Sequence, residues 1–457
     1  MGDSRKMDVM SLELHPDDKR VTKRISAAFI SLLLASSAYS APQQPPDDIK
    51  IAAGLAEAAA KAYRAAGLPW EAKDVRHIPF KPTQNAALPL ARAEAIVGKR
   101  PLGADIQKVR TLLKANSLSE AGQIVKSFSS FLPLVEQAAT CPYLEIGDMD
   151  LGLGGNFPKF AWMKTWVRAL CVRAEFEART NSPRLAARDL QCAWKLSALF
   201  GESRSMIAML VDVAIMRINL DSIQQCAAWL MGDANGLALL QGIPVKSGDI
   251  PKLEDVLIGE GYAGLATIRN LDNAIKNVFG KVDQSRLIRT GIPKEIEARA
   301  MATRHLQIWT RAKSEIVKYR NDPEKMDAAL VALGTQFNEK KGTSYSMTGH
   351  VFEPLNDAAS AVLEVKADIV VTRALLAAMQ EKALLGRWPS SLKEIPRSWI
   401  DPFTGRPLKL KVAGDSIRIY SLGPNRKDDG GVRKSEIKNS AKADYDVVAS
   451  YPPRQIQ

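Results

Sequence analysis

The sequence predicts a mainly α-helical protein: an irregular array of helical hairpins, followed by a small module that combines a long helix with an antiparallel sheet. Three observations predict this fold. Alanine and leucine are abundant while aromatic residues make up only 6% of the chain, a balance that favours helices. Apolar residues recur at intervals of three and four along most of the chain, without the fixed repeat of a regular solenoid. Near the C-terminus the pattern changes to the alternation typical of strands.

The N-terminal residues have the pattern of a secretion leader. Basic residues precede an apolar run at 25–35, and small residues flank Tyr39 in the order expected of a cleavage site. We therefore expect residues 1–40 to be a signal peptide, cleaved after Ser40, and the protein to be exported to the periplasm or the extracellular space. An uncleaved anchor is the alternative, but the run is short for a bilayer. Residues 41–48 form a Pro-rich spacer, and no later apolar run predicts a membrane span after leader cleavage.

Residues 49–350 are predicted to form a helical body, with a candidate subdomain boundary near 240–250. Its clearest hairpin joins an apolar stripe that begins at Phe160 to a helix with Ser182 as N-cap and Pro183 at its first position. Further helices are predicted over 49–66, over 103–137 with a break near Asn116, and over 203–230, 251–278, 294–320 and 323–338.

Charge and cysteine content bear on partners and on the redox state. The formal charge of +13 favours an acidic partner, a protein or an acidic envelope polymer, although the charge is spread as on an ordinary basic surface. Nucleic acid is not expected, because the leader directs export and no binding motif is present. Cys171 and Cys192 lie about equally far from the turn near residue 181. They would form a disulfide if both faced the interhelical seam, and free buried thiols are the alternative.

Residues 354–457 are predicted to form the C-terminal module, in which one long helix packs on a small sheet. An amphipathic pattern predicts the helix over 362–385. Strands are predicted over 408–412, 417–420 and 445–448. Gly414 and the aspartate after it fit a two-residue hairpin turn between the first two strands.

Several motifs of the module resemble one known family. The motifs are Gly-Arg-Trp-Pro at 386–389 with Leu392, Asp-Pro-Phe-Thr-Gly at 401–405, Tyr-Ser-Leu-Gly-Pro-Asn at 420–425 and Asp-Asp-Gly-Gly at 428–431. Together they resemble the globular domain of the major pseudopilins of type II secretion, a domain that also closes many large uncharacterised exported bacterial proteins with helical bodies. The resemblance covers under a quarter of the chain.

The resemblance implies the fold of the module but not assembly into a pilus. A pseudopilin has a long apolar N-terminal helix that packs into a filament. Here the corresponding helix is internal and carries charged residues, among them Glu364, Lys366, Asp368 and Arg373, which prevent it from spanning lipid.

Major pseudopilins bind calcium in the loop after the Ser-Leu-Gly motif. By position, the resemblance implies the Leu422 carbonyl, Asn425, Asp444 and Asp446 as ligands, and Asp428 and Asp429 lie in the same segment. Calcium takes six to eight oxygen ligands, which clustered carboxylates between glycines can supply. An acidic surface turn is the alternative, since six Lys and Arg residues also lie between Asn425 and Asp444.

No catalytic or cofactor-binding residues can be assigned from motifs. The four histidines are scattered, and nucleophile-elbow, phosphate-loop and dinucleotide motifs are absent. Glu260, between two glycines in an apolar stretch, is the least ordinary single carboxylate. The sequence therefore favours a non-enzymatic exported protein whose helical body is a binding or scaffold surface. The alternative is an exported hydrolase with a carboxylate site between the helical body and the C-terminal module.

Overall fold

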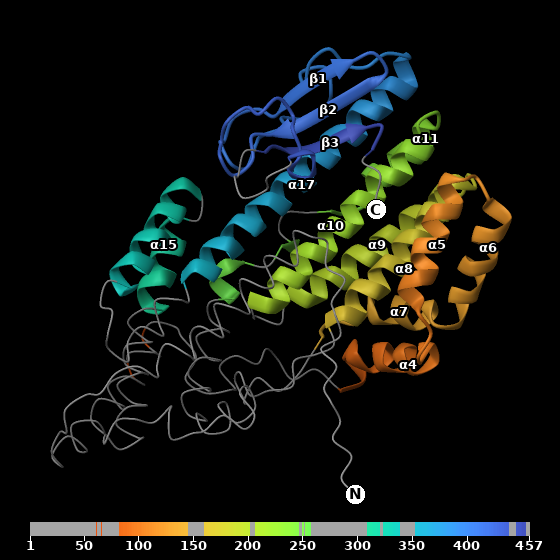
Figure 1. The fold of residues 1–457 in the computed structure, drawn as a ribbon, viewed down its shortest axis with the longest axis horizontal. Helices are drawn as coiled ribbons and strands as arrows, with labels where there is room; N and C mark the ends of the chain where they lie inside the picture. The colour runs from red at the N-terminus through yellow and green to blue at the C-terminus, as the bar shows by residue number, and fades with distance from the viewer. Residues whose placement is uncertain are drawn as a thin grey trace, which may run out of the picture.

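The computed structural model describes residues 61, 65, 82–144, 160–201, 206–245, 249–250, 252–256, 309–319, 323–338, 352–437 and 445–453. Within these ranges most residues are helical and one small antiparallel sheet lies near the C-terminus, which confirms the mainly α class (Figure 1). The leader, the spacer, Glu260 and Asp444 lie outside the described residues.

Four short helices form a first layer over the central hairpin. They are α4 (Ala87–Val97), α5 (Leu102–Lys114), α6 (Leu118–Ser127) and α7 (Leu132–Ala138), with 3-10 turns at Pro82–Gln84 and Phe128–Ser130. The predicted break at Asn116 is confirmed, because this residue adopts φ +59° between α5 and α6. A second break at Phe131 was not predicted. The layer packs on helix α8 through α5, α6 and α7 (Figure 1).

Three long helices make up the centre of the helical body. They are α8 (Phe160–Arg179), α9 (Pro183–Gly201) and α10 (Met206–Trp229), followed by α11 (Ala234–Gln241). Helix α9 begins at Pro183, as predicted, after a turn in which Asn181 has φ +59°. Helix α10 contacts α8, α9 and the later helix α17, so it lies at the centre of the helical body.

Helix α17 (Phe352–Leu385) is the longest element in the described ranges and joins the two parts of the chain. It begins ten residues before the predicted start of 362. One side packs on α10 and α11, while α15 (Pro323–Asn338) lies along its N-terminal part (Figure 1). Two further helical segments occupy 253–256 and 309–319.

The sheet has the order β1-β2-β3, with all neighbours antiparallel. Strand β1 (Lys409–Ala413) pairs with β2 (Ser416–Ser421) across the predicted turn, where Gly414 has φ +57°. Strand β3 (Val447–Tyr451) starts two residues later than predicted and pairs with β2. Strands β2 and β3 pack on α17, and a 3-10 turn at Lys434–Glu436 lies between them in the chain.

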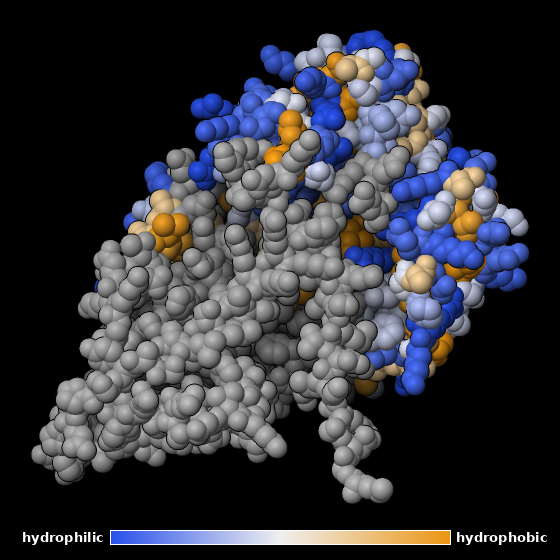
Figure 2. All heavy atoms as spheres, viewed as in Figure 1, coloured by the Kyte–Doolittle hydropathy of each residue, from blue (hydrophilic) through white to orange (hydrophobic). Residues whose placement is uncertain are grey.

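Buried side chains of the helical body and of the sheet belong to one continuous hydrophobic cluster, which α17 spans. Figure 2 shows mostly hydrophilic side chains over the sheet and over the first helical layer, with small hydrophobic groups between them. None of the helices in the described part of the chain has the length and apolar character needed to cross a membrane.

Candidate functional site

The carboxylate of Asp401 fixes the start of the predicted calcium loop. Asp401 is 1% exposed, and its Oδ1 accepts hydrogen bonds from the Ser421 hydroxyl at 2.6 Å and the Phe403 N–H at 2.9 Å. Its Oδ2 accepts from the Thr404 hydroxyl at 3.0 Å and the Leu422 N–H at 3.1 Å. Both oxygens are therefore satisfied, and they hold Leu422 at the end of β2. From the sequence this aspartate was only part of a turn motif.

The loop after Leu422 is held by close contacts within the module. Gly423 has φ +65°, and a Cβ atom at this position would lie 2.2 Å from the carbonyl oxygen of Tyr445, so glycine is required. The Asn425 side-chain amide donates to Asp429 Oδ2 at 2.8 Å. Two of the predicted ligands therefore contact each other directly.

Among the predicted ligands that the structure describes, Asp446 is the most enclosed, at 2% exposure. Its Oδ2 accepts a hydrogen bond from the Gly431 N–H at 2.7 Å, whereas its Oδ1 is buried and has no hydrogen-bond partner. Burial raises the pKa of Asp446 to about 6, and the charges of Asp429 and Asp428 add to this rise. A cation beside Oδ1 would satisfy the buried oxygen and offset the repulsion among the carboxylates.

Asp428, a further acid of this segment, contacts side chains of strands β1 and β2. Asp428 Oδ1 accepts from the Tyr420 hydroxyl at 3.1 Å, and its Oδ2 lies 3.8 Å from Lys409 Nζ. Burial, together with Asp428, raises the pKa of Tyr420 to about 12. Among the residues that the structure describes, no three His, Cys, Asp or Glu side chains are grouped as metal ligands. Asp428, Asp429 and Asp446 therefore share one loop without forming a complete ligand set.

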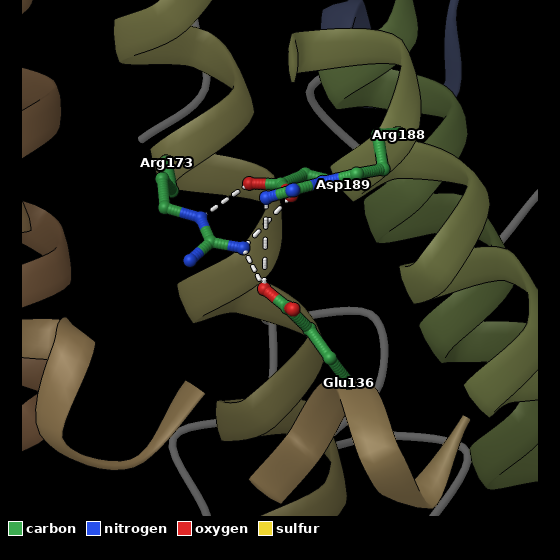
Figure 3. A network of polar contacts seen from close by, with 4 residues as sticks. All are labelled: Glu136, Arg173, Arg188 and Asp189. Atoms are coloured by element: carbon green, nitrogen blue, oxygen red, sulfur yellow. Dashed lines mark hydrogen bonds and ion pairs between the residues drawn. The ribbon is translucent and has the colours of Figure 1, made fainter. Parts of the chain in front are cut away.

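The helical body holds its own charged network, which joins α7, α8 and α9 (Figure 3). Arg173 donates through Nη2 to Asp189 Oδ1 at 2.8 Å and to Glu136 Oε1 at 2.5 Å, and through Nε to Asp189 Oδ2. Asp189 is fully buried, and Arg188 Nη2 lies 3.3 Å from its Oδ1. Burial, with the nearby charge of Asp189, raises the pKa of Glu177 to about 8. This network could not be predicted from local sequence patterns, because its members lie on three helices.

A second buried pair joins α5, α8 and α10. Arg110 donates to both carboxylate oxygens of Glu175, at 3.1 and 2.9 Å. The Ser222 hydroxyl donates to Glu175 Oε1 at 2.6 Å. This bidentate geometry is the strong form of an arginine–carboxylate contact.

The structure does not join Cys171 to Cys192, since all four cysteine thiols in the described residues are free. The rotation of α8 explains why. Cys171 is fully buried near Ser222 and Cys226 of α10, while Cys192 lies near Glu136 of α7. Burial raises the pKa of both Cys171 and Cys192 to about 12, so neither thiol is activated as a nucleophile.

A third charged contact links the helical body to the C-terminal module. Arg217 of α10 donates to Asp368 Oδ2 at 3.0 Å and to Glu364 Oε2 at 2.7 Å, both on α17. The Tyr445 hydroxyl, next to β3, donates to Glu364 Oε1 at 3.0 Å. Burial raises the pKa of Asp368 to about 7, although Arg217 opposes the rise. The charges on α17 therefore serve to attach the module to the body.

Two hollows in the described residues bear on the hydrolase alternative. A cavity of about 150 Å³ lies between α10, α11, α17 and the segment 396–399, where a site between body and module was expected. Its lining includes one carboxylate, Glu381, beside Arg373 and Arg397. An open groove of about 980 Å³ between α9 and α11 has no acidic side chain in its lining. Neither hollow contains the carboxylate pair that glycoside hydrolysis uses.

Comparison with known proteins adds no assignment. No protein-family model matches the chain, and no match is found among curated proteins or among solved structures.

Proposed function

We propose that this protein is a non-enzymatic protein of the envelope or the extracellular space, with its helical body as a binding or scaffold surface. The observation that carries the proposal is that charged side chains between helices are paired with one another. Arg110, Arg173 and Arg217 each bind carboxylates on neighbouring helices. Charges used in this way hold helices in place, whereas a catalytic acid or base must face a space that admits substrate.

The open groove between α9 and α11 supports binding to an acidic partner. Arg184 and Arg188 line it and are exposed, and the apolar side chains of Leu185 and Leu239 are 45% and 37% exposed. Positive charge beside exposed apolar groups is suited to an extended acidic chain that also has apolar portions. A peptide or an acidic envelope polymer has this chemistry.

Binding to polygalacturonate, with neutral dextran as the control ligand, tests the groove. Arg184→Gln should weaken binding to polygalacturonate and reduce its dependence on salt, because a contact between opposite charges is lost. Lys195→Gln is the matched control, because Lys195 is exposed on the same helix but does not line the groove. Equal losses in the two variants, or no binding at all, would contradict a specific groove.

Export is the premise of this proposal, and it can be tested directly. The pattern over residues 1–40 supports cleavage after Ser40. Cell fractionation and N-terminal sequencing should find a chain that begins at Ala41 outside the cytosol. An intact chain that begins at Met1 and remains in the cytosol would contradict export.

We also propose that the C-terminal module is pseudopilin-like and binds calcium. The buried, unpartnered Oδ1 of Asp446 supports the site, as does the nearby carboxylate of Asp429. These oxygens, with those of Asn425 and Leu422, would hold the ion, which would neutralise the carboxylates and stabilise the loop. The family's fourth ligand position, Asp444, lies outside the described residues.

A thermal melt with calcium or with EGTA tests the site. Calcium at about a hundred times its Kd should stabilise the native chain by about 2.7 kcal/mol. Asp446→Asn should abolish the shift. Asp415→Asn is the control, because that carboxylate is 96% exposed in the hairpin turn. Identical melts with and without calcium would refute the site while leaving export and the groove untouched.

A further inference from the structure

A cavity lies between α10, α11 and α17, and its lining combines buried apolar side chains with polar and charged ones. Its volume is about 150 Å³, a size at which an apolar cavity accommodates one benzene ring. Its walls include Leu220 and Ile223 of α10, Leu240 of α11 and Leu376 of α17, all buried. These side chains suit the apolar part of a small ligand.

The charged lining of the cavity has an excess of one positive charge. Arg373 and Arg397 contribute two guanidinium groups and Glu381 one carboxylate, which leaves +1. Burial lowers the pKa of Arg373, and the charge of Arg397 lowers it further, so the two guanidinium groups repel each other. Arg373 donates to the Val245 carbonyl at 3.0 Å, whereas Arg397 forms no ion pair in the described part of the chain. A single negative charge between the arginines would balance this lining.

The segment 396–399 also provides a hydrogen-bond donor that lacks an acceptor. The indole Nε1 of Trp399, a residue of the cavity lining, is buried without a hydrogen-bond partner. A buried donor of this kind normally has an acceptor from protein, water or ligand. Arg397 adopts φ +81°, a conformation that is strained for a residue with a side chain and that is often kept at binding sites.

We propose that this cavity binds a small monocarboxylate, whose apolar part lies among the leucines and whose carboxylate meets Arg373, Arg397 and the Trp399 indole N–H. A carboxylate presents two acceptor oxygens in the geometry that a guanidinium group recognises. A monocarboxylate carries the single negative charge that would balance the lining, whereas a phosphate group carries more charge and has no apolar part. This site is distinct from the groove and the calcium loop, and its failure would leave both proposals standing.

Calorimetric titration of the full chain with benzoate, and with benzamide as its neutral isostere, tests the proposal. The ring of benzoate fits the cavity volume and its carboxylate has the required charge, whereas benzamide keeps the ring but loses the charge. We expect saturable binding of benzoate and at least about tenfold weaker binding of benzamide. Equal binding of the two compounds, or no saturable binding of benzoate, overturns the proposal.

Four variants locate the site. Arg397→Gln should weaken benzoate binding about tenfold, while Lys393→Gln, at an exposed position shortly before this segment and outside the lining, should leave it unchanged. Glu381→Gln should strengthen binding, because it removes the negative charge of the lining. Ala377→Leu, which places a larger side chain in the cavity, should abolish binding without lowering the melting temperature. Benzoate binding that is insensitive to Arg397→Gln overturns the proposal, and an unchanged melting temperature shows that each variant is folded.

Discussion

Replacing Glu175 with glutamine should destabilise the protein by about 3–5 kcal/mol, because the substitution leaves the charge of Arg110 buried and unpaired. The Arg110 and Glu175 side chains are only 9% and 2% exposed. Their two hydrogen bonds, with a third from the Ser222 hydroxyl, satisfy charges that water cannot reach. The expected loss is thus set mainly by the uncompensated guanidinium group and not by the hydrogen bonds alone.

Urea denaturation followed by circular dichroism measures this loss. Asp105→Asn is the matched control, because Asp105 pairs with Arg100 at 2.6 Å but the two side chains are 27% and 32% exposed. Water solvates the remaining arginine in that variant, so its loss should stay within about 1 kcal/mol. Each substitution converts a carboxylate that pairs with an arginine into an amide, and the two pairs differ in how exposed they are.

A double variant separates the value of the pair from the penalty of breaking it. Arg110→Met with Glu175→Leu removes both charges and should recover most of the stability lost in Glu175→Gln. The reasoning is refuted if Glu175→Gln costs no more than Asp105→Asn. It is also refuted if the double variant is as unstable as the sum of its single substitutions, since the pair would then stabilise the fold by itself.

Three other substitutions address separate features. In the same urea assay, Gly423→Ala should destabilise the module by more than about 2 kcal/mol, because its Cβ would meet the backbone of Tyr445. Gly414→Ala, which places a Cβ in open space at a similar φ, should cost about 1 kcal/mol. Burial raises the folded-state pKa of Glu177 to about 8, above its unfolded value, so its contribution to stability is lost as pH rises from about 4 to 8. Glu177→Gln should flatten that part of a stability–pH profile. Arg217→Met should cost about 1–3 kcal/mol in urea denaturation, because it leaves two partly buried carboxylates, 12% and 25% exposed, without their arginine.

Local signals predicted the elements whose ends are decided by neighbouring residues. Pro183 begins α9 because the N–H groups in the first turn of a helix have no partner within the helix, so the missing N–H of proline costs nothing there. Asn116 interrupts the helix over 103–137 because asparagine tolerates a positive φ. Gly414 forms the hairpin turn for the same reason. The secretion leader and the resemblance to pseudopilins stay predictions.

Features that depend on how helices rotate and pack could not be predicted. Cys171 and Cys192 lie about equally far in sequence from the turn near residue 181, but α8 turns Cys171 toward α10. The start of α17 at Phe352 was missed because the amphipathic pattern becomes clear only further along the helix. Arg217 and Glu364 are 147 residues apart in sequence, so no local pattern connects them.

The charged residues of α17 explain why a single long helix can serve two packing partners. Glu364 and Asp368 pair with Arg217, and Arg373 donates to the Val245 carbonyl, so three of the charges that exclude a lipid-spanning helix attach it to the helical body. A uniformly apolar face of α17 could shift along α10 by one helical turn with little loss in the free energy of unfolding. These charged pairs, however, match only in one register. The same register places Tyr445 against Glu364 and brings Arg373 to the cavity lining. The sheet, the body and the proposed carboxylate site are therefore positioned by one set of charges, and a shift of α17 would disrupt all three together.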